Sequence, residues 1–88
     1  MHIHWLHCSG PCTWIEFAHP TDDTCSFTAR ITRRGMDWKA HLSGMRESGK
    51  PGVVDVIDHQ EVWRDRAAAV ALLLGWLRTY DLPTNLFA

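Results

Sequence analysis

The N-terminal segment HIHWLHCSGPC carries the side chains of this chain that are best suited to bind a transition metal. Structural zinc sites need four Cys or His ligands that converge tetrahedrally, usually as two close pairs. In an extended strand His2 and His4 share one face about 15 to 20 Å from Cys8, and His7 points to the other face. We therefore predict no metal site, with a metal-binding N-terminus as an alternative.

The cysteines and the apolar runs indicate the compartment. The chain has three cysteines and no CxxC pair, which fits a reducing environment better than a disulfide framework. Cys25 is expected to be a small core residue, because free cysteine is among the most buried residue types. The longest apolar run, Ala67 to Leu74, is too short to cross a bilayer, and the N-terminus lacks a signal-peptide pattern. We expect a cytoplasmic protein.

No group of residues has the spacing of a catalytic site. The loop SGMRESGKPG contains glycines and Lys50, but it lacks the spacing of a phosphate-binding loop. The six histidines are scattered along the chain, and no motif pairs a nucleophile with a base. We expect a protein that is not an enzyme and that has no catalytic residues and no cofactor.

Chain length limits the number of domains, and net charge limits the classes of binding partner. The 88 residues are expected to form a single domain, 1–88. On folding, a chain of this length buries about 60 to 65% of the surface that the unfolded chain exposes. The net charge of −1 provides no overall positive field to hold a nucleic acid. Arginine exceeds lysine by seven to two, a bias typical of GC-rich coding DNA that suggests a bacterial or phage source.

Short antiparallel strands are predicted between closely spaced turn signals. From Cys25 to Arg33, apolar and polar residues alternate, the period of a strand with one buried face. The next segment repeats the alternation, with Met36, Trp38, Ala40 and Leu42 on the apolar side. A two-residue turn at Arg34-Gly35 would join the two strands. The cross-strand pairs would then be Ile31 with Trp38, Arg30 with Lys39, and Thr32 with Asp37.

The rest of the chain completes an α+β fold. In the first strand Ile3 and Trp5 are predicted to point inward and His2, His4 and Leu6 outward, and in the second Thr13, Ile15 and Phe17 inward. Val53 to Ile57 is predicted as a further strand, with an extension as far as Trp63 as an alternative. We predict a four- or five-stranded antiparallel sheet, mostly a meander, with one C-terminal helix packed on one face.

The helix is predicted from Arg66 to about Tyr80, with Asp65 as its N-cap because a short carboxylate accepts from the free amides of the first turn. An alternative is an earlier start at a capping box formed by Asp58 and Glu61. The face that covers the sheet is predicted as Ala69, Leu72, Leu73, Trp76 and Tyr80. The back of the helix would carry Ala67, Ala71 and Gly75 with Leu74 beside them, small residues that allow a partner helix or a second copy to approach.

The outer face of the sheet is predicted to bind a partner. Trp14 is expected beside Arg30, with His4, Leu6, Thr28, Lys39 and His41 nearby. Such a tryptophan is either shielded by stacking of the arginine guanidinium or forms part of a protein-binding hot spot, where Trp and Arg are enriched.

These features predict a small non-enzymatic protein-binding domain that acts as a homodimer. Its size and composition, but no motif, are comparable with those of anti-CRISPR proteins and other phage or mobile-element inhibitors of host machinery, including defence systems. The alternative from another class is a DNA-binding protein that uses the Arg30–Lys39 hairpin, in which Arg33 and Arg34 add positive charge. No membrane association is expected.

Overall fold

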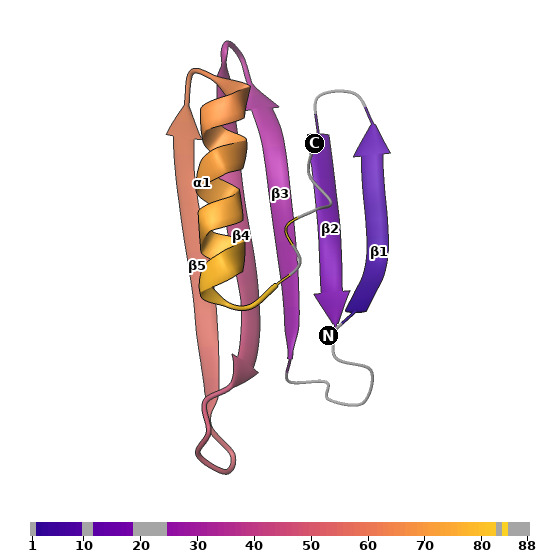
Figure 1. The fold of residues 1–88 in the computed structure, drawn as a ribbon, viewed down its shortest axis with the longest axis vertical. Coiled ribbons are helices and arrows are strands. Elements are labelled where there is room, and N and C mark those ends of the chain that lie inside the picture. The colour runs from indigo at the N-terminus through magenta and orange to yellow at the C-terminus, as the bar shows by residue number, and fades with distance from the viewer. Residues whose placement is uncertain (1, 10–11, 19–24, 83, 85–88) are drawn as a thin grey trace.

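The computed structural model describes residues 2–9, 12–18, 25–82 and 84, with side chains described for 25–82 and 84. Its elements are β1 (His2–Ser9), β2 (Cys12–Ala18), β3 (Ser26–Arg34), β4 (Asp37–Glu47), β5 (Val54–Trp63) and α1 (Arg66–Thr79). The strands form one antiparallel sheet in the order β1-β2-β3-β4-β5, with α1 against one face (Figure 1). The predicted α+β class, antiparallel sheet and C-terminal helix are confirmed.

The β3–β4 hairpin has the predicted faces, but the predicted register is wrong by two residues. Arg30 lies opposite His41 and not opposite Lys39. The turn residues are Gly35 and Met36, and Gly35 has a φ of 61°, as a type II′ turn requires at its first central position. A displacement of two residues leaves every strand side chain on its face. The same displacement corrects the pairs predicted as Ile31 with Trp38 and Thr32 with Asp37, which are observed as Ile31 with Ala40 and Thr32 with Lys39.

Met36 is a further correction, because it belongs to this turn. The sequence alternation predicts that it points into the core together with Trp38, Ala40 and Leu42. In the structure Met36 is 89% exposed, whereas Ala40 and Leu42 are fully buried. The strand β4 begins only after the turn, at Asp37, so the alternation of β4 does not include Met36.

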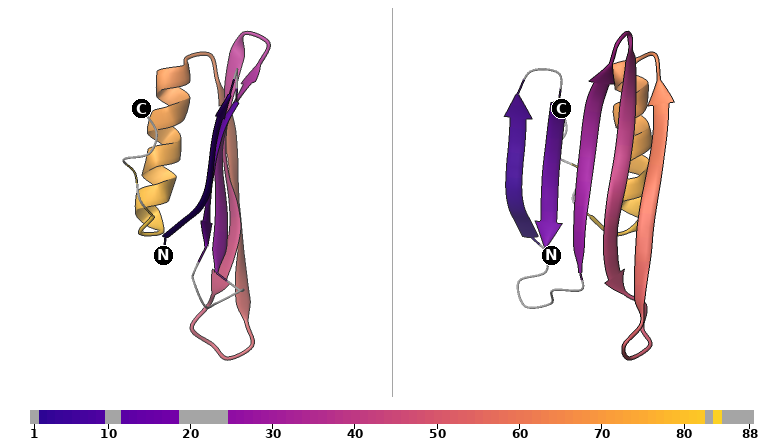
Figure 2. Two further views of the ribbon diagram at one scale, coloured as in Figure 1. Left: turned by 90° about the vertical axis from the view of Figure 1, so that its right-hand side faces the viewer. Right: turned by 180° about the vertical axis from the view of Figure 1, so that it is seen from behind.

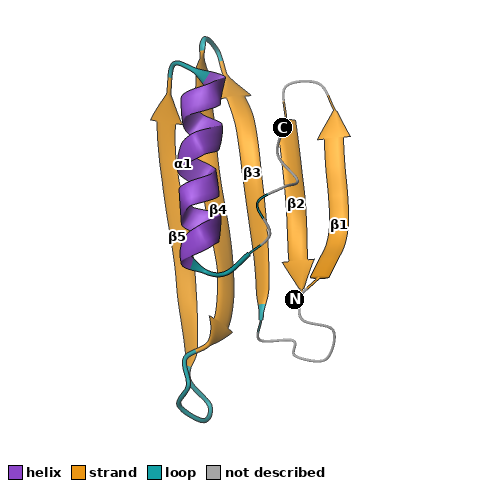
Figure 3. Ribbon diagram, in the orientation of Figure 1, coloured by secondary structure: helices purple, strands orange, loops and turns teal. Residues whose placement is uncertain are grey.

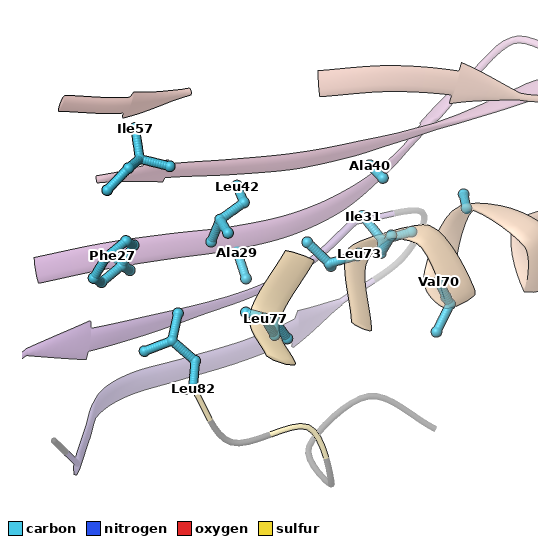
Figure 4. Packing of buried hydrophobic residues seen from close by; sticks show 11 residues of the cluster. Phe27, Ala29, Ile31, Ala40, Leu42, Ile57, Val70, Leu73, Leu77 and Leu82 are labelled. Atoms are coloured by element: carbon cyan, nitrogen blue, oxygen red, sulfur yellow. The ribbon is translucent and has the colours of Figure 1, made fainter. Parts of the chain in front are cut away.

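The core lies between α1 and the face of β3, β4 and β5 that α1 covers, which we call the inner sheet face. Phe27, Ala29 and Ile31 alternate along β3 and are buried, as their spacing predicts. Leu73 and Leu77 approach them from the helix (Figure 4). Cys25 is half-buried at the border of this core and carries a free thiol.

The start of α1 agrees with the sequence prediction. The Asp65 carboxylate accepts a hydrogen bond of 3.2 Å from the backbone N–H of Ala67, and the helix begins at Arg66. The alternative start at Asp58 and Glu61 is wrong, because both residues lie within β5. The pairing of β5 with β4 satisfies backbone N–H and C=O groups of β4, which would lack these partners if the helix began at Asp58.

The buried face of α1 is rotated relative to the predicted face. Ala69, Val70, Leu73 and Leu77 are buried, whereas Leu72, Trp76 and Tyr80 are only half-buried. The helix packs against β4, β5 and the adjacent part of β3, and the Trp76 ring stacks on His59 of β5 at 5.4 Å between centroids. Leu72 and Trp76 therefore lie on the flank of α1 towards β5.

The sheet is covered by a helix on one side only. Viewed edge-on, α1 lies on one side of the strands and no described element lies on the other (Figure 2). Within the described part of the chain, no helix has the length and apolarity needed to cross a bilayer.

Candidate functional site

The outer sheet face is the surface of β3, β4 and β5 opposite α1. Its side chains alternate along each strand with the buried residues of the inner face. Most of them are polar, and they come from three neighbouring strands: Thr28, Arg30, Thr32, Lys39, His41, Ser43, Asp58 and Gln60. No described layer covers this face, so its side chains are available for binding.

The strand register aligns three of the predicted site residues in one row. Trp14 of β2 pairs with Arg30 of β3, as the sequence predicts, and Arg30 pairs with His41 of β4. The structure describes only the backbone at Trp14, and Arg30 is exposed. Lys39 lies two positions along β4, opposite Thr32. Directly paired residues are about 5 Å apart, so the row Trp14–Arg30–His41 is continuous across the strands.

The β1 register corrects the predicted placement of His4 and Leu6. The pairing of β1 with β2 shifts between Ile3 and Trp5, and a β-bulge of this kind interrupts the alternation of a strand. His4 falls at this irregularity, and the residue opposite Trp14 is His7. The predicted alternation along the first strand is wrong beyond this point, since Leu6 pairs with Ile15 and Trp5 pairs with Glu16.

His41 forms a side-chain hydrogen bond that the sequence analysis did not predict. Its Nε2 lies 2.7 Å from Oδ1 of Asp58 on β5, so the imidazole N–H donates to the carboxylate. The His41 side chain is 24% exposed and that of Asp58 55%. Asp58 could have been found only from the register of β4 with β5, which places it diagonally to His41.

The outer sheet face also has an apolar part towards β5. Met45 and Val56 lie directly opposite each other on β4 and β5, and they are 41% and 81% exposed. Val62, at the other end of β5, is 51% exposed. The face therefore combines the row that contains Arg30 with exposed aliphatic side chains, the mixture that protein-binding surfaces present.

A basic end forms where the β3–β4 turn meets the β5–α1 connection. The Arg66 guanidinium lies over the Trp38 ring at 5.6 Å, and Arg64 lines a hollow with Met36 and Asp37. The basic residues of this end are Arg33, Arg34, Lys39, Arg64 and Arg66, and its acidic residues are Asp37 and Asp65. The hairpin cations do not share one face, because Arg33 is on the inner side and donates from Nε to the Gly35 carbonyl at 3.0 Å.

The back of α1 is exposed, as the sequence predicts. Ala67, Ala71 and Gly75 are exposed and Leu74 is half-buried. A hollow of about 490 Å³ lies along this helix, lined by Ala67, Val70, Ala71 and Leu74 together with Asp65 and Arg66. A side chain at Gly75 would meet no atom within 4 Å.

The substitution Ala71→Glu tests whether this helix back joins two copies. Because Ala71 is exposed and glutamate is a good helix former, the variant should fold with unchanged helix content and with stability within about 0.5 kcal/mol. Circular dichroism and thermal unfolding check this. A dimer held by the helix back would become a monomer in sedimentation velocity, because the contact would bury two unpaired carboxylates. Loss of folding would contradict the exposed position of Ala71.

Among the residues whose side chains are described, no three His, Cys, Asp or Glu residues are close enough to hold one metal ion. The N-terminal histidines and Cys8 and Cys12 lie outside this set. Comparison of the chain with protein-family models, with curated proteins and with solved structures found no match.

Proposed function

We propose that this protein is a non-enzymatic protein-binding module that covers a surface of a protein partner with its outer sheet face. The row Trp14–Arg30–His41 would form the centre of the contact, with Lys39 at its border. Inhibition of host machinery by a phage or mobile-element product is the setting that size and composition favour.

The observation that carries the proposal is the combination of residues on one uncovered face. Arg30 is exposed in register with Trp14, and Met45 and Val56 lie exposed on the same face. Tryptophan and arginine dominate protein-binding hot spots, and methionine is enriched at interfaces. The face carries the carboxylate of Asp58 among its basic residues, and a carboxylate at this position would repel a polyanion.

The substitution Trp14→Ala should weaken partner binding by about 2 kcal/mol, or roughly 30-fold in Kd, if Trp14 is a central anchor. The partner is first captured from a bacterial lysate that has been treated with nuclease, and its affinity is then measured by calorimetry. Trp63→Ala is the matched control, since Trp63 is 43% exposed and lies opposite Trp38 on the other face. Equal affinity of wild type and Trp14→Ala would exclude the outer sheet face as the contact.

The basic end favours DNA binding as the second candidate function. Five cations against two carboxylates give this end a positive field that the net charge of the chain conceals. DNA binding would be lost on substitution of Arg33, Arg34, Arg64 or Lys39, would be insensitive to Trp14→Ala, and would fall steeply with salt. Loss of all captured material on nuclease treatment would support this candidate against the protein-binding module.

A further inference from the structure

The strand β5 forms one edge of the sheet. Its hydrogen-bonded neighbour is β4, and the strand order ends at β5. No described element lies along its other side (Figure 3). A free strand edge presents unpaired N–H and C=O groups, which proteins commonly block with lysine, proline or a bulge. The sequence VDVIDHQEVW has neither lysine nor proline, and its pairing with β4 has no register shift.

Two of the exposed apolar residues of β5, Val56 and Val62, are placed symmetrically about His59. Val56 and Val62 are 81% and 51% exposed, lie on the same face of the sheet, and are each three residues away from His59. A two-fold axis through His59 would therefore bring Val56 of one copy opposite Val62 of the other, twice. The geometry points to a second copy of this chain as the occupant of the β5 edge, and we propose an antiparallel β5–β5 dimer centred on His59.

Hydrogen bonding limits which registers are possible. Along β5, every second residue directs its N–H and C=O towards β4, and the residues between them direct theirs outward. In an antiparallel ladder, residues that exchange hydrogen bonds lie directly opposite each other. The axis must therefore pass through a residue and not between two residues. The same rule keeps outer-face side chains opposite outer-face side chains.

Cross-strand pairs distinguish the remaining registers. With the axis at His59, Asp58 lies opposite Gln60 and each Val56 opposite a Val62. An axis at Asp58 would place this carboxylate opposite its own copy and Asp55 opposite Glu61. Like charges in direct pairs are destabilising and matched β-branched pairs are favourable. An axis at Gln60 would place Asp58 opposite Val62. Among the outer-face pairs, the His59 register is thus the best match of charge and shape.

The helix extends the same contact. An axis perpendicular to the sheet puts α1 of both copies on one side, and α1 packs against β5. Trp76 stacks on His59, so Trp76 of each copy would lie close to the axis, with Leu72 one turn away. Both side chains are half-buried in the single chain. The second copy would cover the flank of α1 that the core leaves open.

Disulfide trapping tests the register directly. In a background of Cys8→Ala, Cys12→Ala and Cys25→Ala, the variants Val56→Cys and Val62→Cys are oxidised separately and as an equimolar mixture. The mixture should form a cross-linked heterodimer on non-reducing gels, because disulfides need Cβ atoms about 4 Å apart. Each variant alone should stay uncross-linked. A mixture of Val54→Cys with Val62→Cys, which reports the Asp58 register, should give at least tenfold less product.

Sedimentation of the chain with its native cysteines provides an independent test. Wild type should show a concentration-dependent dimer, and Val56→Lys should weaken it at least tenfold. Met36→Lys is the matched control, since Met36 is 89% exposed and lies in the β3–β4 turn, outside the β5 edge. Both Met36→Lys and Ala71→Glu should leave the dimer unchanged. A wild type that is monomeric at all concentrations, a monomeric Ala71→Glu, or equal trapping in both registers would overturn the proposal. The test does not depend on the protein partner.

Discussion

Replacing Gly44 by alanine should lower the free energy of unfolding by roughly 3 kcal/mol. Gly44 lies on β4 opposite Phe27 and Ile57. A Cβ atom at this position would lie 2.8 Å from Cα and from Cδ1 of Phe27 and would clash with the Ser26 carbonyl oxygen. Two of these three atoms belong to the β3 backbone, so β3 and β4 would have to separate. Urea-induced unfolding followed by circular dichroism measures the loss.

Gly75→Ala is the matched control for this prediction. Gly75 lies in the exposed interior of α1, and a Cβ atom would meet nothing within 4 Å. Alanine in a helix interior is favoured over glycine by about 0.8 to 1 kcal/mol, so this variant should be more stable than wild type. If both alanine variants had the same stability, the close packing of Phe27 on Gly44 would be contradicted.

Replacing Leu73 by alanine should cost about 3 to 4 kcal/mol of unfolding free energy. Leu73 is fully buried, as are Ile31 and Leu42 on the inner sheet face. The substitution removes apolar contacts and leaves a cavity between α1 and the sheet that the surrounding strands can fill only in part. For a domain of this size the loss is a large share of a total stability of about 5 to 10 kcal/mol. Thermal and urea unfolding should both report it.

Leu74→Ala separates this effect from a loss of helix propensity. Leu74 is the neighbour of Leu73 in α1 but is only half-buried, so its truncation should cost about half as much or less. The two variants have the same composition and nearly the same intrinsic helix stability. Similar losses at both positions would indicate that the buried face of α1 is centred elsewhere.

In these proposals the β5 edge joins two copies of the chain, and the outer sheet face binds the protein partner. Pairing along β5 uses backbone groups, the side chains of Val56 and Val62 and the flank of α1, and it leaves the row Trp14–Arg30–His41 uncovered. Two copies would then present two such rows on the same side of a continuous sheet. A dimer of this kind can engage a partner at two points, which raises its effective affinity without any new contact.

Local sequence patterns determined the elements and the faces of the central strands. The alternation around Phe27, Ala29 and Ile31 specifies which side of β3 is buried, because successive strand residues point to opposite faces. The short carboxylate of Asp65 specifies where α1 begins, since capping depends on neighbouring residues alone. These features arise from contacts between residues close in the chain, and a sequence pattern contains that information.

Only the tertiary structure decided how these elements meet. The positive φ of Gly35 displaced the hairpin by two residues and thereby exchanged Lys39 for His41 as the partner of Arg30. The hydrogen bond of His41 with Asp58 depends on the register of β4 with β5. Such pairings are set by turn geometry and by packing between distant segments. A displacement of two residues preserves the hydrophobic pattern, so that pattern could not distinguish the true register from the predicted one.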